Sequence, residues 1–432
     1  MTDIKTIHTE LAIIGTGMAG MAAAYFASTH NIDTTQTGVN SGILYSSGFF
    51  DLMGVHPIED GKIWENPWHA IDQLVKDMPD HPYARMNRSD IECSMEQFIE
   101  FMGDIERPYM VRTGQNTEVI TPVGTVKPTY GVPLSMWAGA KALKKKSPCL
   151  IVDFTGLKAF SAKQITDTLL PQWPEIRPMR IPFPDMGSST DLYPEHMARA
   201  LEIESNRITL ADAIRPGLGN AMYLGMPAIL GIYRPEQVRK HLEELLGVEL
   251  FEIPTIPPSV PGLRLKEAME TALTGRGIHL LSQKRVLKAQ RQQNGRFVLS
   301  IGDQSSGDIQ HIIESESVIL AGGRFLGMGL HAGRKKIQEP LFDLPVFQPE
   351  DRALWHQANF FDPKGHQINQ AGLEIDASFR PADLSGKPVY DNLFAAGSIL
   401  AHQDWMRQKC GAGLAIATAY GAVNAVKTVL KK

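Results

Sequence analysis

The chain has 432 residues, a formal net charge of −4 and 43% hydrophobic residues. This length predicts two or three domains, and the composition is typical of a globular protein. The mildly negative charge argues against a nucleic-acid-binding protein. No unbroken apolar run reaches eighteen residues and no export signal precedes the first glycines, so we expect no membrane-spanning helix and a cytoplasmic location.

Cysteine usage argues against metal clusters. Cys93, Cys149 and Cys410 lie far apart and form no Cys-x-x-Cys pair. Iron–sulfur clusters and structural zinc sites need several closely spaced ligands, so we expect neither, and no disulfide framework. The basic run 144–146 is interpreted as an exposed loop before a strand at Cys149–Phe154.

The strongest signal lies in the first thirty residues. The apolar run Leu11–Ile14 predicts a buried strand, and the alanine-rich stretch Met18–Ser28 predicts a helix. Between them, Gly15, Gly17 and Gly20 have the spacing G-x-G-x-x-G. In such a turn the first glycine permits the bend, the second lets a phosphate approach the backbone, and the third lets the helix pack on the strand. The helix N-terminus favours an anion. This pattern predicts a nucleotide-type cofactor.

The next strand and loop refine this prediction. A strand expected at Ile32–Thr37 ends without the Asp or Glu that holds an adenosine ribose, and the next acid downstream is Asp51. This absence weakens the case for NAD. The following loop contains Ser46, Ser47 and Gly48, whose small side chains suit packing beside a flat cofactor ring.

The middle of the chain has a sequence pattern that differs from that of the first sixty residues. Residues 61–261 combine turn-rich segments with alternating strand and helix patterns, which predict a second βαβ-like unit. The expected elements are strands at 149–154 and 179–183, helices at 159–170, 195–204 and 235–246, and an extended segment at 251–259. A helix is expected at 262–274.

The last third returns to strand-rich patterning. We expect a β-meander from strands at 286–289, 296–301 and 309–314, then buried strands ending in glycine at 317–323 and 391–398. A long small-residue helix begins at Gly411, and its N-terminus would stabilise an anionic reduced flavin.

These patterns together predict an α/β fold. Residues 1–60 and 262–432 are expected to form a discontinuous, Rossmann-like flavin-binding domain with a βαβ start, a parallel sheet and a β-meander. Residues 61–261 are expected to form a large inserted α/β domain for substrate or partner binding.

The order of these segments resembles the flavin-dependent oxidoreductases of the fumarate reductase and succinate dehydrogenase type. More closely, the chain resembles the family of anaerobic glycerol-3-phosphate dehydrogenase B subunits. The stretches that carry this resemblance are Tyr45–Leu52, His81–Tyr83, Thr121–Thr125, Phe154–Leu157, Pro254–Val260, Gly262–Arg264, Glu339–Pro340 and Cys410–Gly413. They extend over nearly the whole chain.

The resemblance implies oxidation of sn-glycerol 3-phosphate to dihydroxyacetone phosphate during anaerobic growth, with electrons passing to menaquinone and then to fumarate or nitrate. It implies an FAD-containing A subunit and an iron–sulfur C subunit as partners, which would hold this chain at the inner face of the cytoplasmic membrane. The family's B subunit is usually assigned FMN. The missing acid after the second strand fits FMN, and FAD is the alternative.

Two groups of residues are expected to bind ligands. A phosphate calls for arginine, so we expect Arg264 and Arg334 to bind the substrate. Related flavoproteins commonly carry an acid where this chain has Ser398, whose hydroxyl can still bond a ribityl hydroxyl. The expected cofactor-binding residues are Gly15, Gly17, Gly20, Ser46, Ser47, Gly48, Gly322, Gly323, Gly397, Ser398, Gly411 and Gly413.

The catalytic base remains unassigned. Histidine titrates near neutrality, which makes His81, His331 and His402 candidates, yet each is more often structural. Three interpretations stay open. The chain is a flavin-dependent dehydrogenase or electron-transfer subunit, or instead a non-catalytic docking subunit with a vestigial flavin fold, or a stand-alone FAD oxidoreductase of another hydroxy acid.

Overall fold

A computed structural model describes residues 4–39, 42–186, 191–303 and 305–431. Contacts divide the chain into two units. The first consists of Met1–Gly42, Asp51–Phe101 and Ala268–Lys432, and the second of Ile43–Phe50 and Met102–Glu267. The functional domain boundaries expected at residues 60 and 262 stay a prediction.

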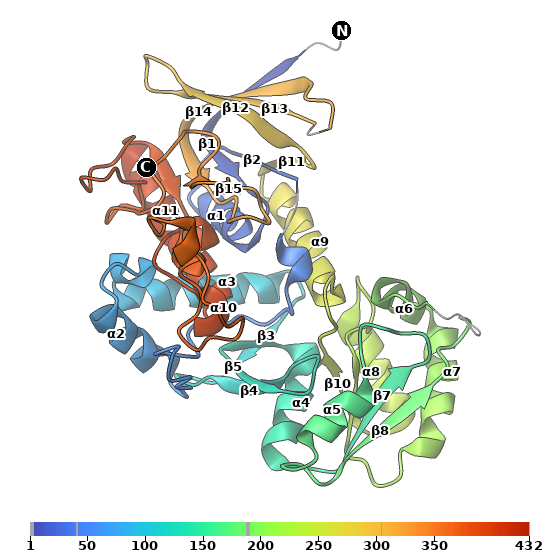
Figure 1. The fold of residues 1–432 in the computed structure, drawn as a ribbon. Coiled ribbons are helices and arrows are strands. Elements are labelled where there is room, and N and C mark those ends of the chain that lie inside the picture. The colour runs from blue at the N-terminus through green and yellow to red at the C-terminus, as the bar shows by residue number, and fades with distance from the viewer. Residues whose placement is uncertain (1–3, 40–41, 187–190, 304, 432) are drawn as a thin grey trace. The chain divides into compact units, whose positions relative to one another are not determined.

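The first unit is built on a sheet with the strand order β11-β2-β1-β14-β13-β12 (Figure 1). Strand β17 also pairs with β14. Strands β11, β2, β1, β14 and β17 run parallel, whereas β12, β13 and β14 form an antiparallel meander. The strands are β1 (Lys5–Ile14), β2 (Thr34–Gly38), β11 (His279–Ser282), β12 (Arg285–Arg291), β13 (Phe297–Gly302), β14 (Ile309–Leu320) and β17 (Leu393–Ala395). The predicted α/β fold, with its βαβ start and meander, is confirmed.

One strand differs from the prediction. Segments 309–314 and 317–323 were expected to be separate strands, but Ile309–Leu320 is continuous. Its first half pairs with β13, its last residues pair with β17, and β1 pairs with it between His311 and Leu320. Ser315 and Glu316 lie between the two expected segments. In the sheet, Ser315 is fully buried and its hydroxyl donates to the Ser317 carbonyl, so the polar stretch continues the strand.

Two helices of small residues contact each other in the first unit. Helix α1 (Met18–Thr29) follows β1, and α11 (Gly411–Val429) packs against it (Figure 1). The buried alanines of both helices allow this close approach. The ring of Tyr25 on α1 stacks on Phe101, with 4.2 Å between ring centroids. The other elements here are α2 (Pro67–Asp77), α3 (Arg88–Asp104), α10 (Trp405–Gln408), β15 (His331–Ala332) and β16 (Ile337–Gln338).

The second unit contains a four-stranded parallel sheet in the order β10-β9-β7-β8. Its direction of winding reverses between β7 and β9, as in doubly wound folds. The sheet strands are β7 (Cys149–Phe154), β8 (Ile176–Ile181), β9 (Tyr223–Pro227) and β10 (Glu249–Ile253). Short strand pairs are formed by β3 (Tyr109–Val111) with β6 (Gly131–Pro133), and by β4 (Thr117–Ile120) with β5 (Val126–Thr129). The helices are α4 (Leu134–Lys145), α5 (Ala162–Leu169), α6 (Pro194–Leu201), α7 (Glu204–Ile214) and α8 (Pro235–Leu246), together with the first half of α9 (Val260–Gly275), whose residues from Ala268 on belong to the first unit.

Two predictions in the second unit were wrong. The basic run 144–146 is not a loop: Lys144 and Lys145 form the last turn of α4, and Lys146 ends it in a left-handed conformation. Cations near a helix C-terminus are favourable because they interact with the partial negative charge at that end of the helix dipole. The single helix expected at 195–204 is two helices, α6 and α7.

Candidate functional site

The glycine turn sits where β1 ends in the first unit. Gly15 has φ +129°, which only glycine adopts readily. A Cβ on Gly15 would lie 2.2 Å from the Ala321 carbonyl oxygen, and one on Gly20 would lie 2.1 Å from the Gly15 oxygen. These two glycines therefore allow the turn and the helix to approach the sheet closely.

Gly17 has a different environment. It is the N-cap of α1, and no heavy atom of the described residues lies within 4 Å of a Cβ built on it. Because Gly17 has no side chain, it gives the first N–H groups of α1 no side-chain cap. A helix N-terminus beside open backbone is suited to a phosphate, so this turn fits a phosphate-bearing cofactor.

The ends of neighbouring parallel strands come together with this turn. The loop after β14 carries Gly322 and Gly323, and the backbone nitrogen of Gly322 is 2.9 Å from the Cβ position of Gly15. The loop after β17 carries Gly397 and Ser398: a Cβ on Gly397 would lie 2.5 Å from Ala19 on α1, and the Ser398 hydroxyl is 3.4 Å from the Cβ position of Gly323. Six predicted residues from three loops thus lie around the start of α1. They are Gly15, Gly17, Gly322, Gly323, Gly397 and Ser398.

Gln36 is a residue of this site that sequence reasoning did not assign. It lies on β2, is fully buried, and donates from Nε2 to the Gly15 carbonyl at 2.8 Å. Its Oε1 has no hydrogen-bond partner among the described residues. The side chain thus ties β2 to the glycine turn, and it supplies no carboxylate for a ribose.

The glycines that open α11 have a packing role. A Cβ on Gly413 would lie 2.8 Å from both Leu52 Cα and the Tyr83 hydroxyl, and one on Gly411 would lie 2.9 Å from the Trp405 ring. Farther along α11, Thr418 accepts a hydrogen bond from the Gly397 backbone nitrogen at 2.8 Å, which joins this helix to the site. Cofactor contact by Gly411 and Gly413 stays a prediction.

The serine loop belongs to the second unit. The Ser46 hydroxyl accepts from the Gly48 backbone nitrogen at 3.1 Å, and the Ser46 carbonyl accepts from the Ser259 hydroxyl. The Gly48 carbonyl accepts from the Tyr109 hydroxyl at 2.5 Å. These bonds hold the loop in shape, and the expected cofactor contact of Ser46, Ser47 and Gly48 stays a prediction.

The two arginines expected to bind substrate differ in environment. Arg264 is 5% exposed and binds both carboxylate oxygens of Glu252, at 2.6 and 2.7 Å, and the Gly231 carbonyl at 2.7 Å. The positive charge of Arg264 is therefore neutralised by Glu252 inside the protein. Arg334 lies exposed between β15 and β16. Substrate binding by either arginine stays a prediction.

The three histidine candidates also differ. His81 is fully buried, and its Nδ1 accepts from the Tyr83 backbone nitrogen at 3.2 Å, which caps the following turn. His402 bonds Glu374 at 2.9 Å, and His331 is exposed on β15. Burial lowers the pKa of His81 to about 3, so this ring is neutral at pH 7 and inaccessible as a base.

The lowered pKa of His81 predicts a pH-dependent stability. The unfolded chain binds a proton at His81 below about pH 6.5 while the folded chain does not, so stability falls from there down to about pH 3. Between pH 7 and pH 5 we expect the wild type to lose about 2 kcal/mol more than His81→Asn, whose amide oxygen keeps the turn cap. Urea unfolding at both pH values measures this, and equal losses would contradict it.

Within the described ranges, no helix is long and apolar enough to cross a membrane. The same residues hold no group of three or more histidine, cysteine, aspartate or glutamate side chains placed to bind a metal ion.

Comparisons with known proteins agree with this arrangement. The profile of the FAD binding domain family matches residues 10–414. The B subunit of anaerobic glycerol-3-phosphate dehydrogenase from Vibrio cholerae serotype O1 (strain M66-2) is 30% identical over 433 residues, which cover 97% of each chain. A probable B subunit of anaerobic glycerol-3-phosphate dehydrogenase from Halobacterium salinarum (strain ATCC 29341 / DSM 671 / R1) is 30% identical over 436 residues, which cover 97% of this chain and 98% of that protein.

A solved structure of a flavocytochrome c3 fumarate reductase in its open conformation is also similar, with 11% identity and a TM-score of 0.41 over 99% of this chain and 79% of that chain. The family profile and the two B-subunit relatives each match nearly the whole chain. The chain therefore belongs to the FAD binding domain family and, within it, to the family of anaerobic glycerol-3-phosphate dehydrogenase B subunits.

Proposed function

We propose that this chain is the flavin-binding B subunit of an anaerobic glycerol-3-phosphate dehydrogenase, which oxidises sn-glycerol 3-phosphate to dihydroxyacetone phosphate. The observation that carries the proposal is the open backbone at Gly17, at the start of α1 and among three glycine-bearing strand ends. The names of the relatives support the reaction. A bound flavin would supply the hydride acceptor for the secondary alcohol.

We propose FAD as the cofactor. The missing acid after β2 favoured FMN in the sequence, but the matching family profile is an FAD binding domain. The turn from Gly15 to Gly17 would hold the pyrophosphate, and the Ser398 hydroxyl would reach a ribityl hydroxyl. Since Gln36 is buried at the end of β2, the adenosine ribose would find its partners elsewhere.

Release of the cofactor tests this assignment. We expect the purified chain to absorb near 450 nm and to release FAD on heat denaturation, identified by chromatography against FAD and FMN standards. Release of FMN alone would restore the sequence-based prediction. A colourless chain that takes up neither flavin would favour the docking subunit with a vestigial fold.

We further propose that this protein works with an FAD-containing A subunit and an iron–sulfur C subunit, which carry its electrons to menaquinone. The relatives are named as B subunits, which supports an assembly of several chains. These partners would place the chain at the inner face of the cytoplasmic membrane. Co-expression of the three subunits, with glycerol 3-phosphate oxidation coupled to a menaquinone analogue, tests this proposal. Full activity of this chain without partners would favour a stand-alone oxidoreductase.

A further inference from the structure

The end of β2 lies directly against the glycine turn. Gln36 and Gly38 are two residues apart on this strand, so both positions belong to the same face of the sheet. A Cβ on Gly38 would lie 2.9 Å from the Thr16 hydroxyl and 3.0 Å from the Thr16 backbone nitrogen. The Gln36 side chain reaches Gly15. Both positions at which β2 could present an acid to a ribose therefore contact the turn instead.

Two hydrogen bonds from β2 hold Gly15. Its backbone nitrogen donates to the Thr37 carbonyl at 2.7 Å, and its carbonyl accepts from Gln36 Nε2 at 2.8 Å. Within the described ranges, the Gln36 amide is the one donor bonded to this oxygen. The oxygen also lies against α1, because a Cβ on Gly20 would come within 2.1 Å of it. The Gly15 carbonyl is thus enclosed between β2 and α1, where it needs a donor.

The surroundings of Gln36 define what that donor must be. The side chain is fully buried, and its Oε1 has no hydrogen-bond partner among the described residues. On the two flanking strands, the residues in register with it are Ile13 and Leu280, which are apolar. The position therefore uses the donor half of the amide. A carboxylate here would place a negative oxygen beside the Gly15 carbonyl without compensation.

Peptide geometry carries this constraint into the turn. Because the peptide bond from Gly15 to Thr16 is planar and trans, the direction of the Gly15 carbonyl fixes the opposite direction of the Thr16 N–H. The next residue is Gly17, the N-cap of α1. Rotation of the peptide toward another donor would move the backbone that leads into α1. The Gln36 amide therefore controls the shape of the turn proposed to hold a phosphate.

We infer that Gln36 is a positioning residue for the cofactor, because its amide donor fixes the Gly15 carbonyl and with it the phosphate-binding turn. This inference rests on the proposed binding of a flavin nucleotide. In many dinucleotide-binding units an acid at the end of the second strand accepts hydrogen bonds from ribose hydroxyls, so ionisation of the acid favours binding. Position 36 has the opposite requirement: an ionised acid there weakens cofactor binding, and protonation restores it.

Replacement of the amide by an acid gives the sharpest test. At pH 8.5 we expect Gln36→Glu to bind FAD at least about tenfold more weakly than the wild type, and at pH 5.5 to recover to within about threefold. Burial favours the protonated carboxyl, whose O–H group can replace the amide donor. Titration of the flavin-free chain with FAD, followed by flavin fluorescence, measures the affinity. An affinity of Gln36→Glu that rises with pH would assign the position to the ribose and overturn the inference.

Two comparisons isolate the effect of the carboxyl group. Gln290→Glu adds the same charge at an exposed position on β12 and should bind FAD like the wild type at both pH values. On the flanking strand β11, His279 is exposed and lies in register with Thr35. The wild type carries this histidine too, so comparison with the wild type removes its contribution to the pH profile.

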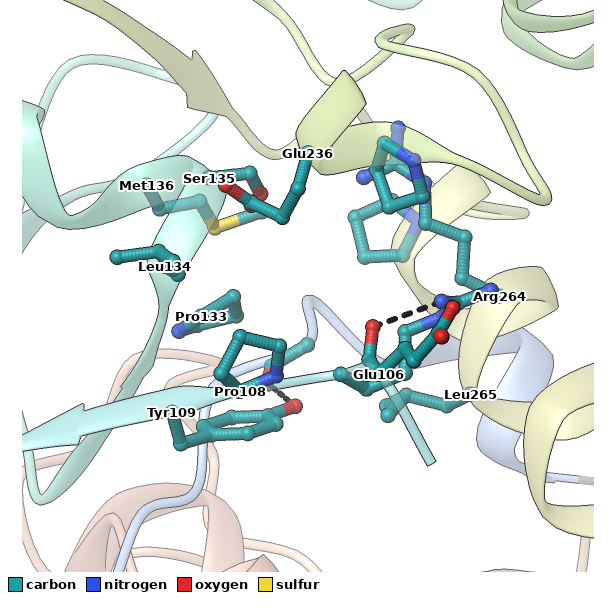
Figure 2. Close-up of a pocket in the computed structure, with 14 residues that line it drawn as sticks. Glu106, Pro108, Tyr109, Pro133, Leu134, Ser135, Met136, Glu236, Arg264 and Leu265 are labelled. Carbon is teal, nitrogen blue, oxygen red and sulfur yellow. Dashed lines mark hydrogen bonds between the residues drawn. The ribbon is translucent and has the colours of Figure 1, made fainter. Parts of the chain in front are cut away.

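Gln36→Met removes the donor and keeps the length of the side chain. Its affinity for FAD should fall at least about fivefold at both pH values, without recovery at pH 5.5. Ser135→Ala is the matched control. Ser135 belongs to the second unit, where it lines a pocket (Figure 2), and its buried hydroxyl donates to Glu252 at 2.7 Å. This control also loses a buried donor and should unfold at a lower urea concentration, but it should keep the wild-type affinity for FAD.

Urea unfolding of the flavin-free chain provides a second measurement. Burial raises the pKa of a carboxyl at position 36 in the folded chain, so Gln36→Glu should lose stability relative to the wild type as the pH rises from 5.5 to 8.5. This test stands even if Gln36→Met fails to fold. Unchanged FAD affinity in folded Gln36→Met, or a stability difference that does not grow with pH, would overturn the inference while the proposed function stands. A wild-type chain that binds no flavin would overturn both.

Discussion

Replacing Arg264 by methionine is expected to lower the free energy of unfolding by about 3–5 kcal/mol, because it leaves the buried carboxylate of Glu252 without its counter-ion. The Glu252 side chain is fully buried, and Arg264 contacts both of its oxygens. The same carboxylate also accepts from Ser135 and from the Leu230 backbone nitrogen, at 2.7 Å each. The loss of one arginine thus disturbs a network that joins α4, α9 and β10.

Guanidinium unfolding of the purified chain measures this loss. The exposed pair of Arg215 and Asp212 provides the control, since Arg215→Met should cost less than about 1 kcal/mol. The double variant Glu252→Gln with Arg264→Met should recover more than half of the loss, because glutamine keeps an acceptor for Leu230 and removes the unpaired charge. A single Arg264→Met variant as stable as the wild type would show that the pair contributes no net stability.

Substituting Gly17 by valine is expected to weaken flavin binding while leaving the chain folded. The Cβ at this position meets no described atom within 4 Å, and φ is −78°, which a valine tolerates. The added side chain would occupy the space proposed for a phosphate. Loss of one hydrogen bond to a charged group costs about 1.5–3 kcal/mol, which corresponds to about a 10- to 100-fold loss of affinity. Flavin absorbance per chain and titration with FAD measure the effect.

Variants at two other glycines provide comparisons for this experiment. Gly103→Val is the matched control, because its Cβ also meets no described atom within 4 Å and it lies on α3, far along the chain from the glycine turn. It should keep its flavin. Gly15→Ala should lose both flavin and stability, since the new Cβ would lie 2.2 Å from the Ala321 oxygen. Wild-type flavin affinity in Gly17→Val would refute the phosphate site.

The sequence by itself determined the local backbone of the site. Glycine spacing, an apolar run and an alanine-rich stretch predicted β1, the turn and α1, because each property acts within a few residues. The same reasoning found the ends of β14 and β17 and the start of α11. Sequence reasoning left out helices α2, α3 and α4, although α2 begins with an Asn66 cap and a proline in its first turn.

Only the tertiary structure decided how side chains distant in sequence pair with each other. The sequence predicted that Arg264 binds a phosphate, but in the fold it pairs with Glu252. Arg107, to which the sequence gave no role, has a buried Nε without a hydrogen-bond partner among the described residues. In the sequence, the position of Gln36 showed only that an acid is absent there. In the fold, its side chain donates a hydrogen bond to the Gly15 carbonyl. Backbone geometry follows from neighbouring residues, but the neutralisation of a charge depends on which distant groups the fold brings within hydrogen-bond distance.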